Sequence, residues 1–450
     1  MQNVSRSITK LYQFYLKYIP LFIIVALLLG VILAKYIPQV LNVADFLISK
    51  LIDGIVFLAP FAIFVILAPS LSKMIRASKE SGFALFIIIW FGMTRILAGL
   101  WAAVFTTVIL RLPLLGQGAG GNGGSFEVLL VQNLVVLKNL MLQSVFFWSI
   151  WISIIFGIIA YFWKRLYGYL QRASQGIEVL GDYIEPFIPV LMLLLGAYIY
   201  ALPQTLADSV SSDVIHSISE AGMGKLNLLG LNVNISSEFG LVWIYIIGSV
   251  LIGVGCFIWQ GMQLAILKRY VKGFSVRRFF KEYWLKVYPL AWSTSSEVVS
   301  MPLNMSLIKR SYPEVKRTVR KLIIGLGAYM NINGTTMHVI LLAGIVACLV
   351  GYRPSLFQLA IGVPIIALIG YGVPGIPGEL VLFAVPVVKI LNLPEPIIAL
   401  FMALYLALQV GLPDSFRTGA NVTDNGIYAI GLNKLYKDKF MAVNKIKIKS

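Results

Sequence analysis

The chain has 450 residues, of which 59% are hydrophobic and only 12% are charged. With a mean hydropathy of +0.86, this composition excludes an ordinary soluble globular fold and indicates an integral membrane protein. The formal net charge of +18 does not indicate nucleic-acid binding, because Lys and Arg stand in short segments beside apolar stretches rather than in one basic domain. The two cysteines lie inside apolar stretches, so neither a disulfide nor a zinc site is expected.

Eight apolar stretches reach the roughly 20 residues that a helix needs to cross a bilayer. In chain order they lie at residues 18–37, 43–73, 81–112, 142–164, 178–203, 240–267, 318–350 and 393–432. No small-residue cleavage pattern follows the first stretch, so we expect it to be a retained helix. The expected fold class is an all-α polytopic membrane protein.

Two further apolar segments, residues 276–308 and 355–392, are interrupted at their middles. The first interruption is the polar run from Ser293 to Glu297, and the second is the Gly/Pro run from Gly372 to Gly378. Broken backbone at membrane depth leaves N–H and C=O groups that lipid cannot satisfy, so such segments must be buried in protein or line a cavity. Both segments are therefore predicted to be re-entrant helical hairpins.

The basic residues predict the orientation of the chain, because cytoplasmic loops carry the excess of Lys and Arg. Basic clusters precede the first span, follow the second and the fourth, flank the first hairpin and fill the tail at 433–450, all on one side. Both termini are thus expected in the cytoplasm, with the protein in a cytoplasmic (inner) membrane. A weak similarity between residues 53–64 and 182–193, whose spans cross in opposite directions, indicates inverted repeats.

The last span carries a polar stripe. At about 100° per residue, one helix face collects Asp414, Arg417, Thr418, Asn421 and Asn425, with Asp424 at its edge. A charge at the bilayer centre costs about 2.5–3.5 kcal/mol, so the stripe must face protein or water and indicates a binding site. Arg417 suits a carboxylate and Asp414 an ammonium group, which together fit an amino acid. The alternative is that these two residues only neutralise each other at positions i and i+3.

The seventh span has a polar interruption of its own, formed by Gly327, Asn331, Asn333, Gly334 and Thr335. Helix distortion there would free main-chain carbonyls, which are ligands for hard cations. The alternative is a Gly/Asn kink that packs against a neighbouring helix.

The order of these motifs resembles the dicarboxylate/amino acid:cation symporter family of glutamate and aspartate transporters. The motifs lie at residues 300–302, 331–335, 372–375 and 414–422, and the resemblance is strongest over 275–432. It implies a homotrimer in which a transport domain moves like an elevator against a scaffold. The implied division is scaffold helices at 1–80 and 113–203, transport-domain parts at 81–112 and 204–275, hairpins at 276–308 and 355–392, the last two helices at 309–354 and 393–432, and a basic tail at 433–450.

The resemblance also implies roles for single residues. Arg417 would bind the side-chain carboxylate of the substrate, Asp414 its amino group, and Asn421 its main carboxylate. The serines that would assist Asn421 are Ser295 and Ser296, and the residues that would close the pocket are Thr335, Thr418, Val373 and Gly375. The positions that would hold transported cations are Gly327, Asn331, Asn333, Asn421, Asp424 and Asn425. Sodium ions or protons are the expected ions, and no cofactor is implied.

This chain departs from the family at several of these positions. Asn333 and Asn425 are neutral where the family has acidic cation ligands, and Asp424 is displaced by one position. Glu297 enters the tip of the first hairpin, and Arg95 stands beside the place where the family has a Thr-Ser pair that helps to bind sodium. We hypothesise that Arg95 places a fixed positive charge beside Asn333 in place of that ion, which would lower the dependence on sodium. The alternative is an arginine that extends to the interface or packs between spans.

The predicted function is secondary active transport of an acidic amino acid or dicarboxylate across the cytoplasmic membrane, coupled to a cation. The alternative within transport is a sodium-independent exchanger, either proton-coupled or uncoupled. An intramembrane enzyme would need a nucleophile with a base, and Ser296 with Glu297 is the nearest pair, without a histidine near it in sequence. A gated anion pore is a third alternative. The expected partners are a small-molecule substrate, membrane lipid and other copies of the chain, and no nucleic acid.

Overall fold

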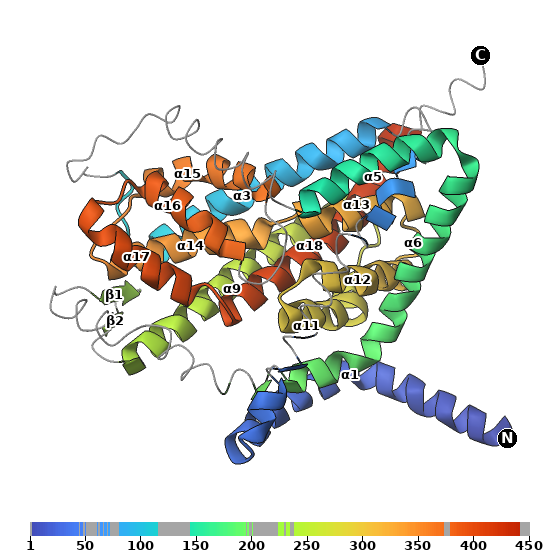
Figure 1. Ribbon diagram of the computed structural model, residues 1–450, viewed down its shortest axis with the longest axis horizontal. Helices are drawn as coiled ribbons and strands as arrows, with labels where there is room; N and C mark the ends of the chain where they lie inside the picture. Colours follow the sequence, from blue (N-terminus) through green and yellow to red (C-terminus); the bar gives the residue numbers. More distant parts are fainter. Residues whose placement is uncertain are drawn as a thin grey trace.

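The computed structural model describes residues 2–44, 81–115, 145–194, 224–228, 231–234, 238–372 and 379–441, together with short pieces between 46 and 72 and between 196 and 200. Over these residues the chain is a bundle of helices with one small β-hairpin (Figure 1).

The elements fall into three groups along the chain. The first group is α1 Gln2–Tyr36, α3 Ser81–Leu110, α5 Val145–Phe162, α6 Lys164–Ile184 and η1 Glu185–Phe187. The second is β1 Lys225–Leu228, β2 Leu231–Asn234, α9 Glu238–Tyr270, α10 Val276–Phe279, η2 Phe280–Trp284, α11 Leu285–Thr294 and α12 Glu297–Ser311. The third is α13 Arg317–Met330, α14 Asn333–Leu349, α15 Leu356–Ile369, η3 Gly370–Gly372, η4 Glu379–Phe383, α16 Ala384–Leu391, α17 Glu395–Leu408, α18 Leu412–Leu435 and η5 Tyr436–Met441.

Three helical segments among the described residues are long and apolar enough to cross a membrane, namely Gly82–Leu110, Gly240–Tyr270 and Arg317–Leu349. The pair Glu395–Leu408 and Leu412–Phe440 passes the same test together and is bent by 65°. These helices support a multi-pass membrane protein. The number of eight spans stays a prediction, because the second expected span, 43–73, lies largely outside the described residues.

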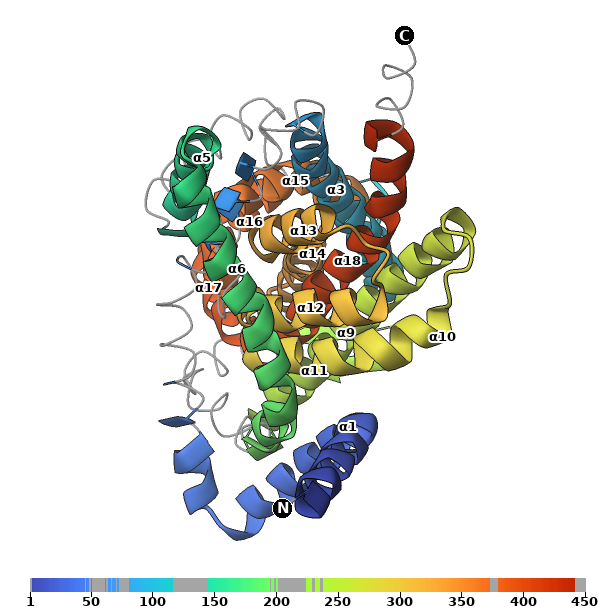
Figure 2. The same ribbon diagram turned by 90° about the vertical axis from the view of Figure 1, so that its right-hand side faces the viewer.

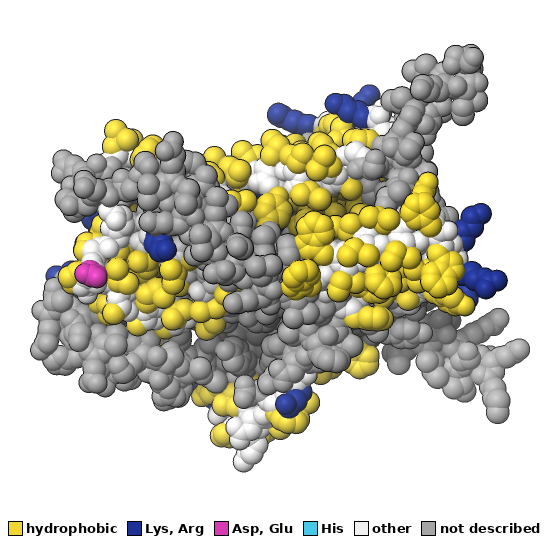
Figure 3. All heavy atoms as spheres, turned by 45° about the horizontal axis from the view of Figure 1, so that its top comes forward, with side chains coloured by type: hydrophobic (Ala, Val, Ile, Leu, Met, Phe, Trp, Pro, Cys, Tyr) yellow, Lys and Arg dark blue, Asp and Glu magenta, His cyan; other side chains and the backbone are white. Residues whose placement is uncertain are grey.

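The seventh predicted span forms the centre of the bundle. Within Arg317–Leu349, 94% of the apolar 18-residue stretch is buried. The corresponding stretches of α3 and α9 are only 39% and 44% buried, so these two helices leave much more apolar surface for lipid. Figure 2 shows α13, α14 and α18 enclosed by α3, α9, α12 and α15. In Figure 3 hydrophobic side chains cover broad bands of the surface, and Lys and Arg lie mainly at its upper and right-hand edges, with a few at the left and on the lower projection.

The first interrupted segment breaks within its polar run. α11 ends at Thr294 and α12 begins at Glu297. Between them Ser295 has a φ of +46°, in the left-handed region, and Ser296 caps α12 by accepting a hydrogen bond from the amide of Val299 at 3.5 Å. The chain therefore makes a helix, a turn and a second helix here, and the re-entrant path through a membrane stays a prediction. In the second segment the predicted tip residues Val373 and Gly375 lie outside the described residues.

The structure adds three features to the expected elements. The span predicted over 393–432 is divided into α17 and α18 at Gly411, whose φ of +80° an L side chain rarely adopts. The interval between the fourth and fifth spans is helical, since the amphipathic α6 starts at Lys164 directly after α5. The described residues are mainly helical, as the expected all-α class requires, and a short antiparallel hairpin of β1 and β2 lies within the predicted outer loop, with Leu226 and Leu228 turned inward.

Candidate functional site

All six polar residues of the α18 stripe are buried. Arg417, Thr418, Asn421 and Asp424 have no exposed surface, and Asp414 and Asn425 are each 1% exposed. The stripe faces α9, α13, α14 and the α11–α12 hairpin, which pack against α18. α18 begins just after Gly411, with Pro413 in its first turn. Proline is tolerated there because the N–H groups of the first turn have no acceptor within the helix, so the helix starts where the polar residues begin.

Arg417 is bound within the protein on two sides. Its Nε and Nη2 contact Oδ1 of Asp414, three residues earlier on α18. Its Nη1 donates to the hydroxyl of Thr335 on α14 at 2.7 Å. In this conformation the two charged residues neutralise each other, as the sequence alternative proposed, and the guanidinium still presents one edge to the start of α14.

Asn421 joins three elements. Its Nδ2 donates to Oε1 of Glu297 on α12 at 2.8 Å and to the Thr335 hydroxyl at 3.1 Å, and its Oδ1 accepts from the amide of Gly334 at 2.6 Å. Gly334 is required by this close packing, because a Cβ there would lie 2.3 Å from the carbonyl oxygen of Arg417. Arg417, Asn421, Thr335 and Glu297 thus form one cluster, which we call the Arg417 cluster and which also includes Asp414.

The remaining predicted substrate residues lie around this cluster with different partners. Ser295 shares a hydrogen bond of 3.1 Å with Ser415 of α18, a residue that sequence reasoning missed. Ser296 is occupied as the cap of α12. Thr418 donates to the carbonyl of Asp414 on its own helix at 2.9 Å, so its hydroxyl is used within α18 and not towards the start of α14.

Most of the predicted cation positions meet at the break between α13 and α14. Asn331 donates to the carbonyl of Asn421 at 3.0 Å and to Oδ1 of Asn425 at 2.9 Å. Asn425 fills the space above Gly327, where a Cβ would lie 2.1 Å from its Oδ1. These four residues form an uncharged hydrogen-bonded group, since Asn425 stands where the family resemblance implies an acidic ligand.

Asp424 lies on another side of α18 and faces α9. Its carboxylate accepts from Trp259 Nε1 at 3.2 Å, Gln263 Nε2 at 3.0 Å and Asn333 Nδ2 at 2.8 Å, with Gln260 Nε2 at 3.5 Å. The α9 residues were missed from the sequence. Their signal is a Trp-Gln pair followed three residues later by a second Gln in an otherwise apolar span, where polar side chains need partners.

Arg95 of α3 is fully buried. Its Nε donates to the carbonyl of Met330 at 2.8 Å, its Nη1 donates to that of Ala367 at 2.9 Å, and its Nη2 also contacts Met330. The guanidinium lies 4.0 Å from the centre of the Tyr371 ring. It therefore binds the C-terminal ends of α13 and α15, and an arginine that extends to the interface is excluded. Asn333, which we expected beside it, has Asp424 and Tyr428 as its hydrogen-bond partners.

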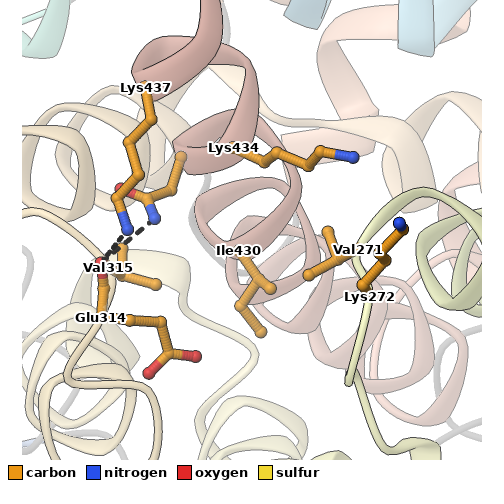
Figure 4. A pocket seen from close by; sticks show the side chains of 8 residues that line it. Val271, Lys272, Glu314, Val315, Ile430, Lys434 and Lys437 are labelled. Atoms are coloured by element: carbon orange, nitrogen blue, oxygen red, sulfur yellow. Dashed lines mark hydrogen bonds between the residues drawn. The ribbon is translucent and has the colours of Figure 1, made fainter. Parts of the chain in front are cut away.

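A pocket of about 460 Å³ lies near the other end of α18 (Figure 4). From Asp414 to Ile430 the helix rises by about 24 Å at 1.5 Å per residue, so the pocket is separate from the Arg417 cluster. Lys437 and Asn433 both donate to the carbonyl of Glu314 there, at 3.0 and 3.2 Å. The lining residues are Val271, Lys272, Glu314, Val315, Ile430, Asn433, Lys434 and Lys437.

Comparison with known proteins identifies the C-terminal part of the chain. No curated protein matches the chain significantly. Residues 226–435 match the family described as the Sodium:dicarboxylate symporter family. The matched segment runs from β1 to the end of α18 and includes the Arg417 cluster and the residues around Asp424, whereas Arg95 lies outside it. Over residues 226–435, the chain is therefore similar to the sodium:dicarboxylate symporter family.

Proposed function

We propose that this protein is a secondary active transporter that carries an acidic amino acid or a dicarboxylate across the cytoplasmic membrane together with a cation. The observation that carries the proposal is the Arg417 cluster, in which a buried guanidinium and a buried carboxylate three residues apart meet the starts of two other helices. Charged residues inside a membrane bundle are costly and mark substrate pathways. The similarity of residues 226–435 to a symporter family supports the same function and favours a transporter over an enzyme.

Arg417 and two helix N-termini supply positive charge for a carboxylate ligand. Glu297 is the first residue of α12 and Thr335 the third of α14, so two helix N-termini face the cluster. Each N-terminus carries a partial positive charge of about one half, which adds to that of Arg417. In the proposed complex Arg417 binds the side-chain carboxylate, Asp414 the amino group and Asn421 the main carboxylate. Ser295, Ser296, Thr335, Thr418, Val373 and Gly375 surround the substrate.

The proposed mechanism is an elevator movement in a homotrimer, with both termini in the cytoplasm. The moving domain comprises residues 81–112 and 204–432, and the scaffold comprises 1–80 and 113–203. The packing of α3, α9 and the hairpins around α13, α14 and α18 supports this division, because these elements bury the Arg417 cluster together. The trimer and the elevator rest on the family resemblance.

Uptake into liposomes tests the proposal. Purified protein should accumulate radiolabelled aspartate, glutamate or succinate under an inward cation gradient. The double variant Asp414→Asn, Arg417→Gln should fold, because the two charges of the ion pair are removed together, and should not accumulate substrate. Arg269→Gln, an exposed arginine on α9, is the control and should transport normally. Full accumulation by the double variant would contradict the proposal.

Arg95 favours a second candidate, a transporter that does not depend on sodium. Its guanidinium already binds carbonyls of Met330 and Ala367 at two helix C-termini, where a free cation would otherwise be attracted. If it supplies that charge permanently, Arg95→Met should make uptake depend more strongly on sodium, and Arg95→Lys should not. If uptake depends on sodium concentration in the same way in the wild type and both variants, the sodium-independent transporter is contradicted.

A further inference from the structure

Asp424 is turned away from the place where an acid at position 425 would lie. A shift of one position on a helix rotates the side chain by about 100°, which moves the carboxylate from the α13 side of α18 to the α9 side. Asn425 accordingly contacts Asn331 of α13, and Asp424 contacts Trp259, Gln260 and Gln263 of α9. The carboxylate of Asp424 therefore contacts residues of α9, whereas an acid at position 425 would face α13.

These neighbours do not neutralise the carboxylate. Its hydrogen-bond donors are the indole N–H of Trp259 and the amide groups of Gln260, Gln263 and Asn333, all uncharged. The titratable side chains that face it are Cys256 of α9, Tyr283 of η2 and Tyr428 of α18, which are neutral near pH 7. Among the described residues no Lys, Arg or His contacts the carboxylate. A fully buried negative charge thus lacks a positive partner within the described chain.

Two amide oxygens beside the carboxylate also lack partners. Gln263 Oε1 and Asn333 Oδ1 are buried and accept no hydrogen bond from any described residue. The NH2 group of each amide is used twice, towards Asp424 Oδ2 and towards the Tyr428 hydroxyl, at 2.7 to 3.0 Å. Buried polar atoms without partners are rare in proteins and need an explanation.

A rotation of the two amide groups explains both features. With NH2 inward, as here, the amides stabilise a bare carboxylate. If the amide groups of Gln263 and Asn333 turn by half a rotation, both amide oxygens face the Asp424 carboxylate. These oxygens repel one another and the carboxylate unless a cation lies between them. The carboxylate, both amide oxygens and the Tyr428 hydroxyl then offer up to five oxygen ligands. Trp259 and Gln260 keep donating to the carboxylate from behind, as the outer partners of metal ligands do.

We propose that Asp424, Gln263, Asn333 and Tyr428 form the binding site of the coupling cation, and that this cation is sodium. The inference rests on the proposed transport function and names its coupling site. An oxygen-only ligand set selects a hard cation, and one carboxylate balances one positive charge. This site differs from the uncharged group around Asn331 and Asn425 and requires α9, which contributes no residue to the Arg417 cluster.

The site is linked directly to the Arg417 cluster. Asn333 is the first residue of α14, and the next two residues bind the cluster, Gly334 to Asn421 and Thr335 to Arg417. A cation that turns the Asn333 amide fixes the first turn of α14, and with it the donors that would hold the substrate. Sodium and substrate should therefore strengthen each other's binding.

Two binding measurements on the purified full chain test the site. The first is direct binding of radioactive sodium, and the second is binding of radiolabelled aspartate at fixed pH in sodium, lithium, potassium or choline chloride. The variants are Asp424→Asn, which keeps the shape and one acceptor oxygen for Trp259, Gln263 and Asn333, and Gln263→Leu, which removes one proposed oxygen ligand. Ser249→Ala is the control, because Ser249 is a buried polar residue of α9 that bonds to Tyr245 instead. Thermal unfolding and gel filtration confirm that each variant is folded.

Asp424→Asn should bind no sodium and should lose the sodium dependence of aspartate binding. Gln263→Leu should weaken sodium binding by about ten- to hundredfold, the usual effect of disturbing a metal site. Sodium binding by Asp424→Asn equal to that of the wild type would overturn the proposal. So would a wild type that binds aspartate with no effect of sodium and with a pH dependence abolished by Asp424→Asn, since the site would then bind a proton. If the wild type binds sodium but no acidic substrate, the proposed function fails while the cation site stands.

Discussion

Glu297 gives the candidate substrate site a second carboxylate. It is 1% exposed and accepts a hydrogen bond from Asn421, the residue proposed to bind the main carboxylate of the substrate. Together with Asp414 it outnumbers the single guanidinium of Arg417. The side chains of the site therefore carry a net negative charge. Repulsion from this charge weakens the binding of an acidic substrate.

Replacing Glu297 by Gln should strengthen the binding of acidic substrates. Gln keeps the oxygen that accepts from Asn421 and removes the charge. Two like charges about 8 Å apart interact by roughly 2 kcal/mol at an effective dielectric constant of about 20, so affinity for aspartate should rise by about ten- to thirtyfold. Equilibrium binding of radiolabelled aspartate measures the change, and Glu282→Gln, which is exposed and paired with Arg278, is the control. Weaker binding would instead show that Glu297 holds the amino group of the substrate.

Single residues were predictable where one segment carries the whole pattern. The stripe from Asp414 to Asn425 lies on one helix, so helical geometry alone placed its members on one face. The partners of Asp424 were not predictable in this way, because Trp259, Gln260 and Gln263 come from a helix about 160 residues earlier and look isolated in an apolar span. Which of them meets α18 depends on packing between helices, and packing is not a local property of the sequence.

At the scale of elements, the break between α13 and α14 is fixed by close glycine contacts. Gly334→Ala would bring a Cβ to 2.3 Å from the Arg417 carbonyl, a main-chain atom that cannot move without shifting α18. We expect a loss of about 1–3 kcal/mol in stability and a marked loss of aspartate binding. Gly248→Ala on α9 is the matched control, since its Cβ would meet only Ile345 at 3.6 Å. Thermal unfolding and ligand binding measure both effects, and equal behaviour of the two variants would contradict the role of Gly334.

The sequence predicted two of the breaks between helices and missed a third. A run of four Ser or Thr residues and the Asn/Gly cluster after Met330 both mark helix ends, and the structure breaks there. The bend of 65° before α18 was missed, because a single Gly and a single Pro in an apolar stretch are compatible with one span. Only the left-handed φ of Gly411 distinguishes this bend from a continuous helix.

At the scale of the whole molecule, the basic residues define one end. Phe83 near the start of α3 packs against Phe440 of η5, with ring centres 5.1 Å apart, so α3 begins at the end where the Lys-rich tail starts. The 30 residues of α3 rise by about 45 Å, which brings Leu114 to the opposite end. Since Lys and Arg are retained in the cytoplasm, the end near η5 should be cytoplasmic.

Cysteine labelling from each side of the membrane tests this orientation. Lys281 and Leu114 are both exposed, so each can be replaced by Cys without loss of a buried contact. The background should carry Cys348→Ala, because Cys348 is partly exposed, whereas Cys256 is fully buried and can stay. A membrane-impermeant thiol reagent should label Leu114→Cys in intact cells and Lys281→Cys only in inside-out vesicles. Labelling of both from the same side would contradict the placement of Leu114 and Lys281 on opposite sides of the membrane. The reversed pattern would place the basic end outside, against the charge rule on which the orientation depends.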